Sequence, residues 1–316
     1  MREEAREEGM IRRIQELKKE KDAFIMAHNY QAAELQDVAD FVGDSLEMAR
    51  FASKISARMV IVCGVYFMAE TVKLLNPDKK VLIPDRTAGC PLAETISPQE
   101  LLRRRAEIGD VKVVSYVNTY ADVKALSDVV CTSANAPRIV SMISRKESAR
   151  RVLFVPDRNL AHFTREVLKD SDIEIIPWNG FCPVHEKVVS VEDVRSARKK
   201  HPGAVVVVHP EVPPEVQKEA DYIRSTGGMI RLVEELKDVK EFVVGTEVGM
   251  IYRLSKRFPD RKFYPLNETM ICTNMKKITL KKLLNSLEEE IFEVVVDESL
   301  ARKAIIPVKK MLEYSE

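Results

Sequence analysis

The sequence has no excess charge of either sign and no long apolar run. Its 50 lysines and arginines almost balance its 49 aspartates and glutamates, which leaves a net charge of +1. Nucleic-acid binders need surplus positive charge to attract phosphate, and this chain has almost none. No segment approaches the roughly 20 consecutive apolar residues of a membrane span, and residues 1–21 lack the apolar core of a signal peptide. We therefore expect neither a nucleic-acid nor a membrane partner.

Cysteine is also scarce. Five scattered cysteines in 316 residues are too few for a disulfide framework, so we expect a reducing, cytoplasmic location. In that setting a cysteine is a buried apolar residue, a metal ligand or a catalytic group. With 45% hydrophobic and 31% charged residues, the chain has enough apolar side chains to form large cores.

An internal repeat is the strongest pattern that the sequence does contain. Residues 24–45, 112–133 and 204–226 align as three copies of one segment. In each copy an apolar run ends at a polar residue, a second polar residue follows two positions later, and an aspartate and a hydroxyl residue come after it. In chain order the matching residues are His28, Tyr30, Asp40 and Ser45; Tyr116, Asn118, Asp128 and Ser133; and His209, Glu211, Asp221 and Thr226.

Each copy predicts a strand, a helix, a short strand, a helix, a strand, a helix and a strand. In the first copy we expect strands near 24–27, 40–43, 58–63 and 80–84, and helices near 31–39, 46–56 and 66–76. Continuous Val/Ile-rich runs that alternate with helices are typical of a parallel sheet covered on both faces. The predicted fold class is α/β, with three homologous αβα sandwich domains of four parallel strands each. The predicted boundaries are an N-terminal helix at 1–22, repeats at 23–110, 111–200 and 201–275, and a C-terminal helical or extended segment at 276–316.

Ligands of open parallel sheets bind at the carboxyl ends of the strands. This rule selects the ends of the three first strands, where His28, Tyr116 and His209 stand. The residue two positions later shares a face with each of them. Ser45, Ser133 and Thr226 are expected at helix N-caps, where hydroxyls and free N–H groups suit phosphate or carboxylate.

The cysteines fall into two groups. Cys63 and Cys131 lie in apolar runs without counterparts in the other repeats, as buried apolar residues do. Cys90, Cys182 and Cys272 each close a repeat in a polar or Gly/Pro-bearing loop. Three thiolates without an obvious fourth indicate a metal centre with one open position, either zinc or a [4Fe–4S] cluster. His185, three residues after Cys182, is either near this metal or an ordinary loop residue.

Several strings together resemble the quinolinate synthase family, and the resemblance runs from about residue 12 to 310. They include AHNYQ (27–31), DRTAGCPLAE (85–94), YVNTYADVKALSD (116–128), CTSANA (131–136), GFCPVHEK (180–187), HPEVP (209–213), STGGM (225–229) and PLNETMICTNMKKITL (265–280).

The resemblance implies an enzyme that condenses iminosuccinate (iminoaspartate) with dihydroxyacetone phosphate to quinolinate, phosphate and two waters, in de novo NAD biosynthesis. It also implies functional coupling to the enzyme that produces iminosuccinate, and three domains in a pseudo-threefold arrangement around a central active site. The implied cofactor is a [4Fe–4S] cluster held by Cys90, Cys182 and Cys272, whose open iron is a Lewis acid. The implied catalytic residues are Tyr30, Glu211 and His185. The implied substrate-binding residues are His28, Ser45, Tyr116, Val117, Asn118, Ser133, His209, Pro210, Glu211 and Thr226.

Two other functions use the same cysteines. The first is a zinc-dependent lyase or aldolase. The second is an iron–sulfur redox sensor, which is disfavoured because a sensor needs no converging set of His, Tyr, Glu and Asn side chains. Metal analysis separates zinc from iron, and an assay for quinolinate separates an enzyme from a sensor.

Overall fold

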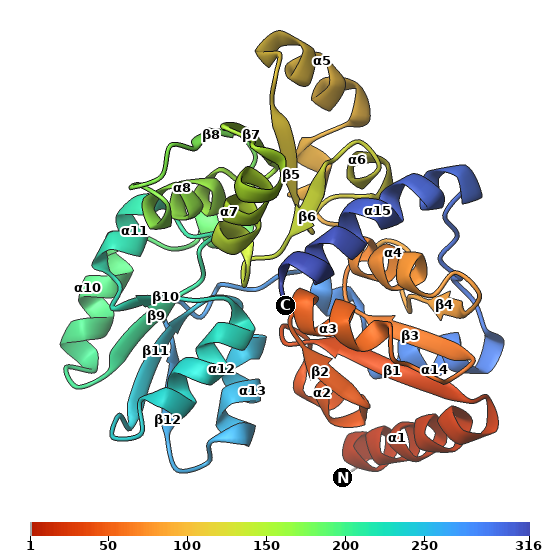
Figure 1. The fold of residues 1–316 in the computed structure, drawn as a ribbon. Coiled ribbons are helices and arrows are strands. Elements are labelled where there is room, and N and C mark those ends of the chain that lie inside the picture. Colours follow the sequence, from red (N-terminus) through yellow and green to blue (C-terminus); the bar gives the residue numbers. More distant parts are fainter. Residues whose placement is uncertain (1) are drawn as a thin grey trace. The chain divides into compact units, whose positions relative to one another are not determined.

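The computed structural model describes residues 2–316, which form three four-stranded parallel sheets (Figure 1). The first sheet consists of β1 (Ala23–His28), β2 (Phe41–Gly43), β3 (Met59–Cys63) and β4 (Lys80–Leu82). The second consists of β5 (Lys112–Tyr116), β6 (Val129–Cys131), β7 (Arg151–Val155) and β8 (Glu174–Pro177). The third consists of β9 (Val205–Val208), β10 (Tyr222–Ile223), β11 (Glu241–Gly245) and β12 (Lys262–Pro265). The predicted α/β class with three four-stranded parallel sheets is confirmed.

The order of strands is the same in every sheet: second, first, third, fourth. The first strand of each repeat is therefore central, with the short second strand on one side and the third on the other. From the first strand the chain crosses to the second strand on one side, and from the second strand it crosses back to the third strand on the other side. The end of the first strand is therefore a topological switch point. Such a point leaves a crevice for ligands at the carboxyl edge.

The helices repeat as well. The helices shared by the repeats are α2 (Ala33–Val38), α3 (Ser45–Ala52) and α4 (Tyr66–Leu75); α6 (Ala121–Lys124), α7 (Ala136–Glu147) and α8 (Arg158–Val167); and α11 (Pro214–Glu219), α12 (Thr226–Glu235) and α13 (Gly249–Arg257). The others are α1 (Arg2–Glu20), α5 (Pro98–Ile108), α9 (Pro183–Glu186), α10 (Val191–Lys200), α14 (Leu280–Glu289) and α15 (Glu298–Tyr314), with 3-10 turns η1 (Ala93–Thr95) and η2 (Met275–Lys277). The elements predicted for the first repeat are present, with ends displaced by a few residues.

Helices cover both faces of the third sheet, as the uninterrupted apolar run of β9 predicts. Val206 and Val208 enter a core with Val216 of α11, whereas Val207 enters the opposite core with Met229 of α12. Successive residues of a strand point to opposite faces, so one short run of valines supplies both cores. The absence of charge in this central strand is thus explained by burial on two sides.

Each repeat joins its first strand to its second through the aspartate of the alignment. The Asp40 carboxylate accepts a hydrogen bond from the Ile25 amide (2.8 Å), and the Asp40 amide donates to the Ile25 carbonyl (2.9 Å). Equivalent pairs, with the same two distances, are Asp128 with Val113 and Asp221 with Val206. These aspartates stabilise the sheets through bonds to the backbone of the first strands, so we assign them a structural role.

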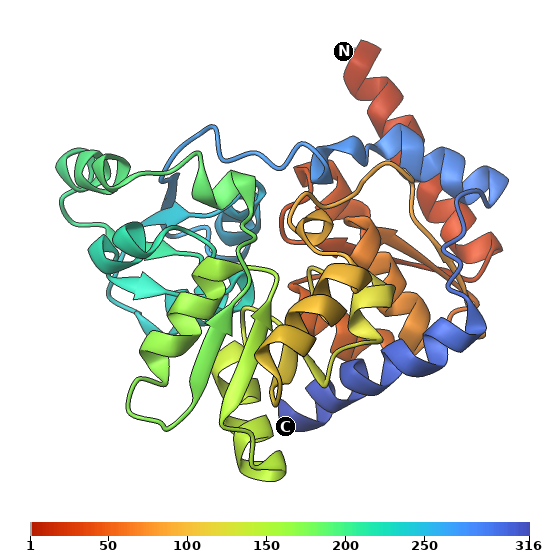
Figure 2. The same ribbon diagram turned by 90° about the horizontal axis from the view of Figure 1, so that it is seen from above.

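The chain divides into two compact units: residues 1–90 with 272–298, and residues 91–271 with 299–316. In the first unit α14 packs beside α1, as Figures 1 and 2 both show. Residues 292–294 run along β4, where the Val294 amide donates to the Val81 carbonyl (2.8 Å) and the Ile83 amide to the Phe292 carbonyl (3.1 Å). The predicted C-terminal segment at 276–316 is therefore shared between the units, and the domain boundaries remain predictions.

In the second unit the C-terminal helix α15 is fastened to the start of α7. The side-chain amide of Asn135 donates to the Ser315 hydroxyl (2.7 Å), and the Arg138 guanidinium donates to the Tyr314 carbonyl (2.8 Å). Among the described residues, no helix combines the length and the apolar character needed to cross a membrane.

Candidate active site

The ends of β1 and β9 hold a histidine in the same way. In the first repeat the ring Nδ1 of His28 accepts a hydrogen bond from the Tyr30 amide (3.2 Å). In the third repeat the ring Nδ1 of His209 accepts from the Glu211 amide (3.3 Å). Since Nδ1 accepts, the neutral ring carries its proton on Nε2, which can donate to a partner or ligand.

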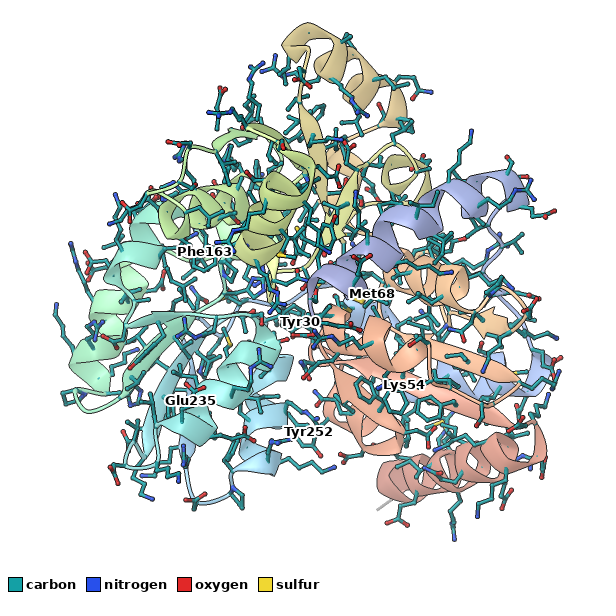
Figure 3. All side chains as sticks on the ribbon, in the orientation of Figure 1. Tyr30, Lys54, Met68, Phe163, Glu235 and Tyr252 are labelled. Atoms are coloured by element: carbon teal, nitrogen blue, oxygen red, sulfur yellow. The ribbon has the colours of Figure 1, made fainter. Side chains whose placement is uncertain are left out.

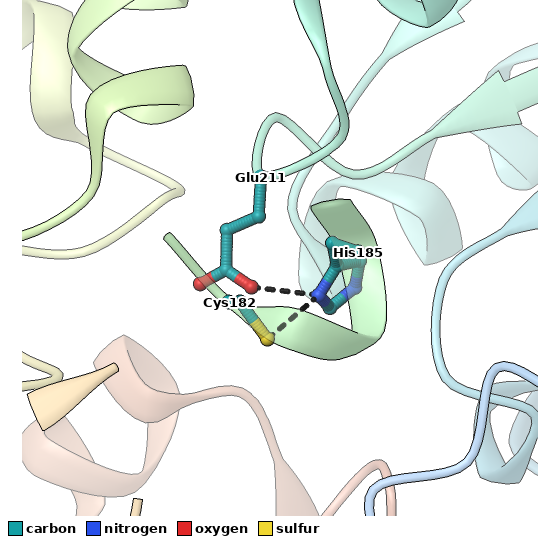
Figure 4. Close-up of side chains that lie close together, drawn as sticks. All are labelled: Cys182, His185 and Glu211. Atoms are coloured by element: carbon teal, nitrogen blue, oxygen red, sulfur yellow. Dashed lines mark hydrogen bonds and ion pairs between the residues drawn. The ribbon is translucent and has the colours of Figure 1, made fainter. Parts of the chain in front are cut away.

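In the second unit the structure brings together residues from the second and third repeats (Figure 4). Glu211, in the loop after β9, accepts from His185 Nδ1 of α9 (2.8 Å) and from the hydroxyl of Tyr116 at the end of β5. These side chains are almost completely buried, with 3% of Glu211, 2% of His185 and 5% of Tyr116 exposed. A buried carboxylate with two hydrogen-bond donors is suited to moving protons rather than to surface solvation.

Two further contacts fix His185. Its Nδ1 lies 3.3 Å from Cys182 Sγ, and its Nε2 lies 2.9 Å from the Thr246 hydroxyl, just after β11. Its ring stands 5.0 Å from that of His209, whose Nε2 lies 3.1 Å from the Ser133 hydroxyl. The predicted candidates Tyr116, Ser133, Cys182, His185, His209 and Glu211 therefore form one connected cluster.

Two buried carboxyl groups near this cluster have pKa values displaced in opposite directions. Burial raises the pKa of Glu211, but electrostatic attraction by His185 and His209 and the hydrogen bonds from His185 and Tyr116 outweigh it and lower this pKa to about 2. For Asp157, at the end of β7, burial and then the charge of Glu211 raise the pKa well above its usual value. Glu211 is thus held as a carboxylate at neutral pH.

In the first unit, the loop after β1 packs against the segment that follows Cys272. The rings of His28 and Tyr30 meet edge to face, with centroids 4.6 Å apart (Tyr30 is labelled in Figure 3). The Lys276 ammonium donates to the Tyr30 carbonyl (2.5 Å), and the Gln31 amide contacts the sulfur of Met275 (3.5 Å). Tyr30, predicted to transfer protons, is thereby held beside a cysteine-bearing segment.

Two cysteine loops are joined in this unit. The backbone amide of Lys276, in the turn η2, donates to the Cys272 carbonyl (3.1 Å). The next residue, Lys277, donates from its ammonium to the Thr87 carbonyl (2.6 Å) in the loop that ends at Cys90. The structure therefore brings the Cys90 loop and the Cys272 loop together, while Cys182 belongs to the other unit.

All three cysteine loops have the same anchor within their own repeats. The carbonyl two residues before the cysteine accepts a hydrogen bond from the backbone at the start of the helix after the third strand. The pairs are Ala88 with Tyr66 (2.8 Å), Gly180 with Arg158 (2.9 Å) and Met270 with Val248 (3.0 Å). The three cysteine loops thus share one backbone anchor, and their correspondence does not depend on sequence order alone.

The first and third loops also share a turn. Asp85 Oδ1 accepts from the amide (2.8 Å) and hydroxyl (2.7 Å) of Thr87, and Asn267 Oδ1 accepts from the amide (2.9 Å) and hydroxyl (2.7 Å) of Thr269. The second loop instead relies on Gly180. A Cβ on Gly180 would lie 2.3 Å from the Thr95 hydroxyl and 2.4 Å from the Pro156 carbonyl, so only glycine fits there.

The other two cysteines differ chemically from these three. Burial raises the pKa of the Cys63 thiol to about 12 and that of Cys131 well above its usual value, which leaves both as neutral thiols. Cys90, Cys182 and Cys272 are partly exposed in loops. Since a metal ligand must be a thiolate, the two buried neutral thiols are poor donors, and metal binding by the three loop cysteines stays a prediction.

The N-cap prediction for the three hydroxyl residues is wrong by one or more positions. The residue before Ser45 takes the cap of α3: Asp44 accepts from the amides of Leu46 (3.0 Å) and Glu47 (2.9 Å). Ser225 likewise caps α12 ahead of Thr226, and Asn135 precedes α7. Ser45 and Thr226 are therefore first residues of their helices, and Ser133 lies in the turn before α7. The side-chain caps of α3 and α12 come from Asp44 and Ser225.

Three substrate-binding candidates lie in the loops after β5 and β9. Val117 donates its amide to the Cys131 carbonyl (2.7 Å), and Asn118 follows it. The carbonyl of Pro210, next to His209, accepts from the side chain of Gln217 (2.9 Å). Their backbones are fixed at the switch points, and binding by their side chains stays a prediction.

Sequence reasoning missed Thr246 and Asp157, which stand at the ends of β11 and β7. Thr246 contacts His185, and the Asp157 carboxylate accepts from the Cys182 amide. The strand-end rule selects both residues once it is extended from the first strand of each repeat to the third.

The described cluster also contains a candidate metal site of a different kind. The ligand atoms of Cys182, His185 and Glu211 lie within 4.8 Å of one another. One thiolate, one imidazole and one carboxylate are a donor set that zinc accepts.

Comparison with known proteins connects this architecture to one family. The family described as quinolinate synthetase A protein matches residues 12–313. A quinolinate synthase of Thermodesulfovibrio yellowstonii is 49% identical over 302 residues, covering 96% of this chain and 97% of its own length. Quinolinate synthases of Thermotoga maritima (305 residues; 96% of this chain, 99% of the relative) and Pyrococcus furiosus (308 residues; 98% and 99%) are each 48% identical.

Proposed function

The chain belongs to the quinolinate synthase family, and from that premise we propose that it is an enzyme of NAD biosynthesis that makes quinolinate. The reaction joins iminosuccinate to dihydroxyacetone phosphate and releases phosphate and two waters. The observation that best supports it is the buried connection from Tyr116 through Glu211 and His185 to Cys182, in which side chains proposed to transfer protons contact a candidate metal ligand. We also propose a cytoplasmic location and functional coupling to the enzyme that supplies iminosuccinate.

The proposed cofactor is a [4Fe–4S] cluster held by the thiolates of Cys90, Cys182 and Cys272. Two observations support this ligand set: all three loops share one backbone anchor, and the remaining cysteines are fully buried thiols with raised pKa values. When bound, the cluster supplies an open iron as a Lewis acid for the elimination of water.

The proton transfers are assigned to this chain's own side chains. The Glu211 carboxylate is the proposed base because it lies within hydrogen-bond distance of His185 (2.8 Å), and His185 is the group through which its proton is exchanged. Tyr30, held by the backbone contacts of its loop, is the proposed acid in the first repeat. Groups of different acidity can take and give protons in successive steps of a reaction.

Substrate binding is assigned to the strand ends. Two carboxylates and a phosphate must be held. In His28 and His209 the ring Nδ1 accepts from a backbone amide, so Nε2 is the nitrogen that can donate. In His209 this nitrogen lies 3.1 Å from the hydroxyl of Ser133, another proposed contact. The proposed contacts are His28, Ser45, Tyr116, Val117, Asn118, Ser133, His209, Pro210, Glu211 and Thr226. Ser45 and Thr226, in the first turns of α3 and α12, stand where the helix backbone favours anions.

A zinc-dependent lyase is the second candidate, favoured by the compact set of Cys182, His185 and Glu211. In that enzyme the carboxylate would be a ligand and not a base. The short distance between His185 Nδ1 and Glu211 Oε2, 2.8 Å, is that of a hydrogen bond. This contact favours the proton-transfer role of Glu211.

The test is an anaerobic purification with iron, sulfide and zinc measured on one sample, followed by addition of iminosuccinate and dihydroxyacetone phosphate. We expect about four irons and four sulfides per chain and formation of quinolinate. Zinc without sulfide, and no quinolinate, would replace the proposal with the lyase. A cluster without quinolinate would instead support the iron–sulfur sensor.

A further inference from the structure

Each repeat contains a buried side chain that donates to two carbonyls of the loop after its first strand. In the first repeat Gln36 Nε2 donates to the carbonyls of Asn29 (3.2 Å) and Gln31 (2.9 Å). In the third, Gln217 Nε2 donates to those of Pro210 and Val212 (both 2.9 Å). In the second, Lys124 Nζ donates to those of Val117 (2.9 Å) and Thr119.

The three donors occupy one position of the repeat. Each stands eight residues after the polar residue that ends the first strand, and each contacts the carbonyls one and three residues after that strand end. All three lie on the first helix of their repeat or at its end. Lys124 is completely buried, and 5% of Gln36 and of Gln217 is exposed. The same pair of bonds is therefore present in all three repeats although the residue type changes.

The paired carbonyls flank the residue with the proposed chemistry. Tyr30 lies between Asn29 and Gln31, Asn118 between Val117 and Thr119, and Glu211 between Pro210 and Val212. A buried carbonyl without a hydrogen-bond donor lowers the stability of the fold. A loop with two carbonyls directed into the protein therefore needs a donor side chain, which the first helix of the repeat supplies. With both bonds formed, the middle residue is presented in one backbone conformation.

On the basis of the proposed function, we propose that Lys124 is a positioning residue for substrate binding by Tyr116 and Asn118. It acts by bonding the two carbonyls on either side of Asn118, the task that Gln36 and Gln217 carry out for Tyr30 and Glu211. Lys124 thus donates to the same two carbonyl positions as the glutamines of the other two repeats. A glutamine, which serves in the sister repeats, is a sufficient replacement.

The experiment compares Lys124→Met with Lys124→Gln in the cluster-loaded protein. Methionine keeps the length and apolar stem but donates no hydrogen bond, whereas glutamine keeps both donors. We expect Lys124→Met to lower kcat/KM by about 100-fold, chiefly through a higher KM, because small misplacements of binding groups have effects of this size. Lys124→Gln should keep most of the wild-type value.

Hydrogen exchange gives a second readout that needs no turnover. In Lys124→Met the peptide spanning 116–121 should exchange faster, while the peptide spanning 209–213 should not change. Gln217→Met should produce the reverse pattern, since each donor holds only its own loop. Lys124→Gln should leave both peptides as in the wild type.

Three outcomes would overturn the inference. Equal losses in Lys124→Met and Lys124→Gln would show that the charge matters and not the pair of bonds. Wild-type kcat/KM in Lys124→Met would show that the loop needs no such support, and faster exchange across the whole second unit would show a general loss of stability. A wild-type protein that makes no quinolinate would refute the proposed function, yet the exchange pattern would still test the positioning role.

Discussion

The end of β1 and the end of β9 have the same backbone but different reactive side chains. Both present a histidine whose Nδ1 is held by a backbone amide two residues later. That later residue is Tyr30 in one case, where it packs on the ring of its own His28, and Glu211 in the other, where it pairs with His185 from another repeat. The comparison shows that the repeat supplies the same backbone structure at both strand ends. The side chain two positions after each histidine then determines how the two strand ends differ chemically.

The largest effect is expected from replacing one of the loop cysteines, which all three repeats share. Cys182→Ser should abolish cluster binding and quinolinate formation, because a serine oxygen does not replace a thiolate at an iron. Iron and sulfide analysis and the loss of the brown chromophore measure this. Cys131→Ala is the matched control, since Cys131 is a buried thiol of β6. A Cys182→Ser protein with full iron and sulfide would contradict the ligand assignment.

The next largest effect separates the two strand ends. Glu211→Gln keeps the shape of the side chain but removes the proposed base, so we expect the proposed cluster to be retained and kcat to fall by about 100-fold or more. Single-turnover product analysis should reveal a stalled intermediate. Glu219→Gln, at a partly exposed residue whose carboxylate lies 3.5 Å from Arg195, should behave as the wild type. Full turnover by Glu211→Gln would refute its role.

A smaller effect tests the anchor of the second cysteine loop. Gly180→Ala places a methyl group against the Pro156 carbonyl, and such overpacking typically lowers the free energy of unfolding by about 1–3 kcal/mol. Denaturant unfolding measures the change. Gly203→Ala is the control, because a Cβ on Gly203 would have nothing within 4 Å. Equal stability of the two variants would show that the loop yields without cost.

The smallest effect concerns the turns before Cys90 and Cys272, which use Asp85 and Asn267 for the same bonds. Burial raises the pKa of Asp85, but the hydrogen bonds from Lys282 and Thr87 outweigh it and lower the pKa overall. A lowered pKa stabilises the fold above the unfolded-state value of about 3.9, and this contribution is lost as the pH falls below it.

Asp85→Asn should therefore reduce the free energy of unfolding at pH 7 by about 0.5–1 kcal/mol, a typical value for a partly exposed ion pair. The difference from the wild type should shrink as the pH falls below about 4. Denaturant unfolding of the apo chain at several pH values measures this. A difference that stays constant with pH would show that the charge of Asp85 contributes nothing.

The sequence was sufficient to predict the sheet of each repeat, but it was not sufficient to predict side-chain contacts between repeats. The apolar runs and the triplicated aspartate predict the sheets because strand burial and the Asp40 bonds act within one repeat. The contact between His185 and Glu211 joins two repeats, and no local pattern encodes it. The sequence misplaces the caps because Asp44 and Ser225 stand beside equally plausible hydroxyl residues. It also conceals the buried donors, because two are glutamines and one is a lysine.

The pairing of residues 292–294 with β4 has a consequence for synthesis of the chain. β4 is an edge strand formed early in the sequence, and its open edge is covered by a segment near the end. A growing chain on the ribosome therefore carries this edge uncovered until almost all of the protein has been made. Uncovered edges invite pairing with other chains. The edge of the first sheet is thus covered only after this late segment has been synthesised.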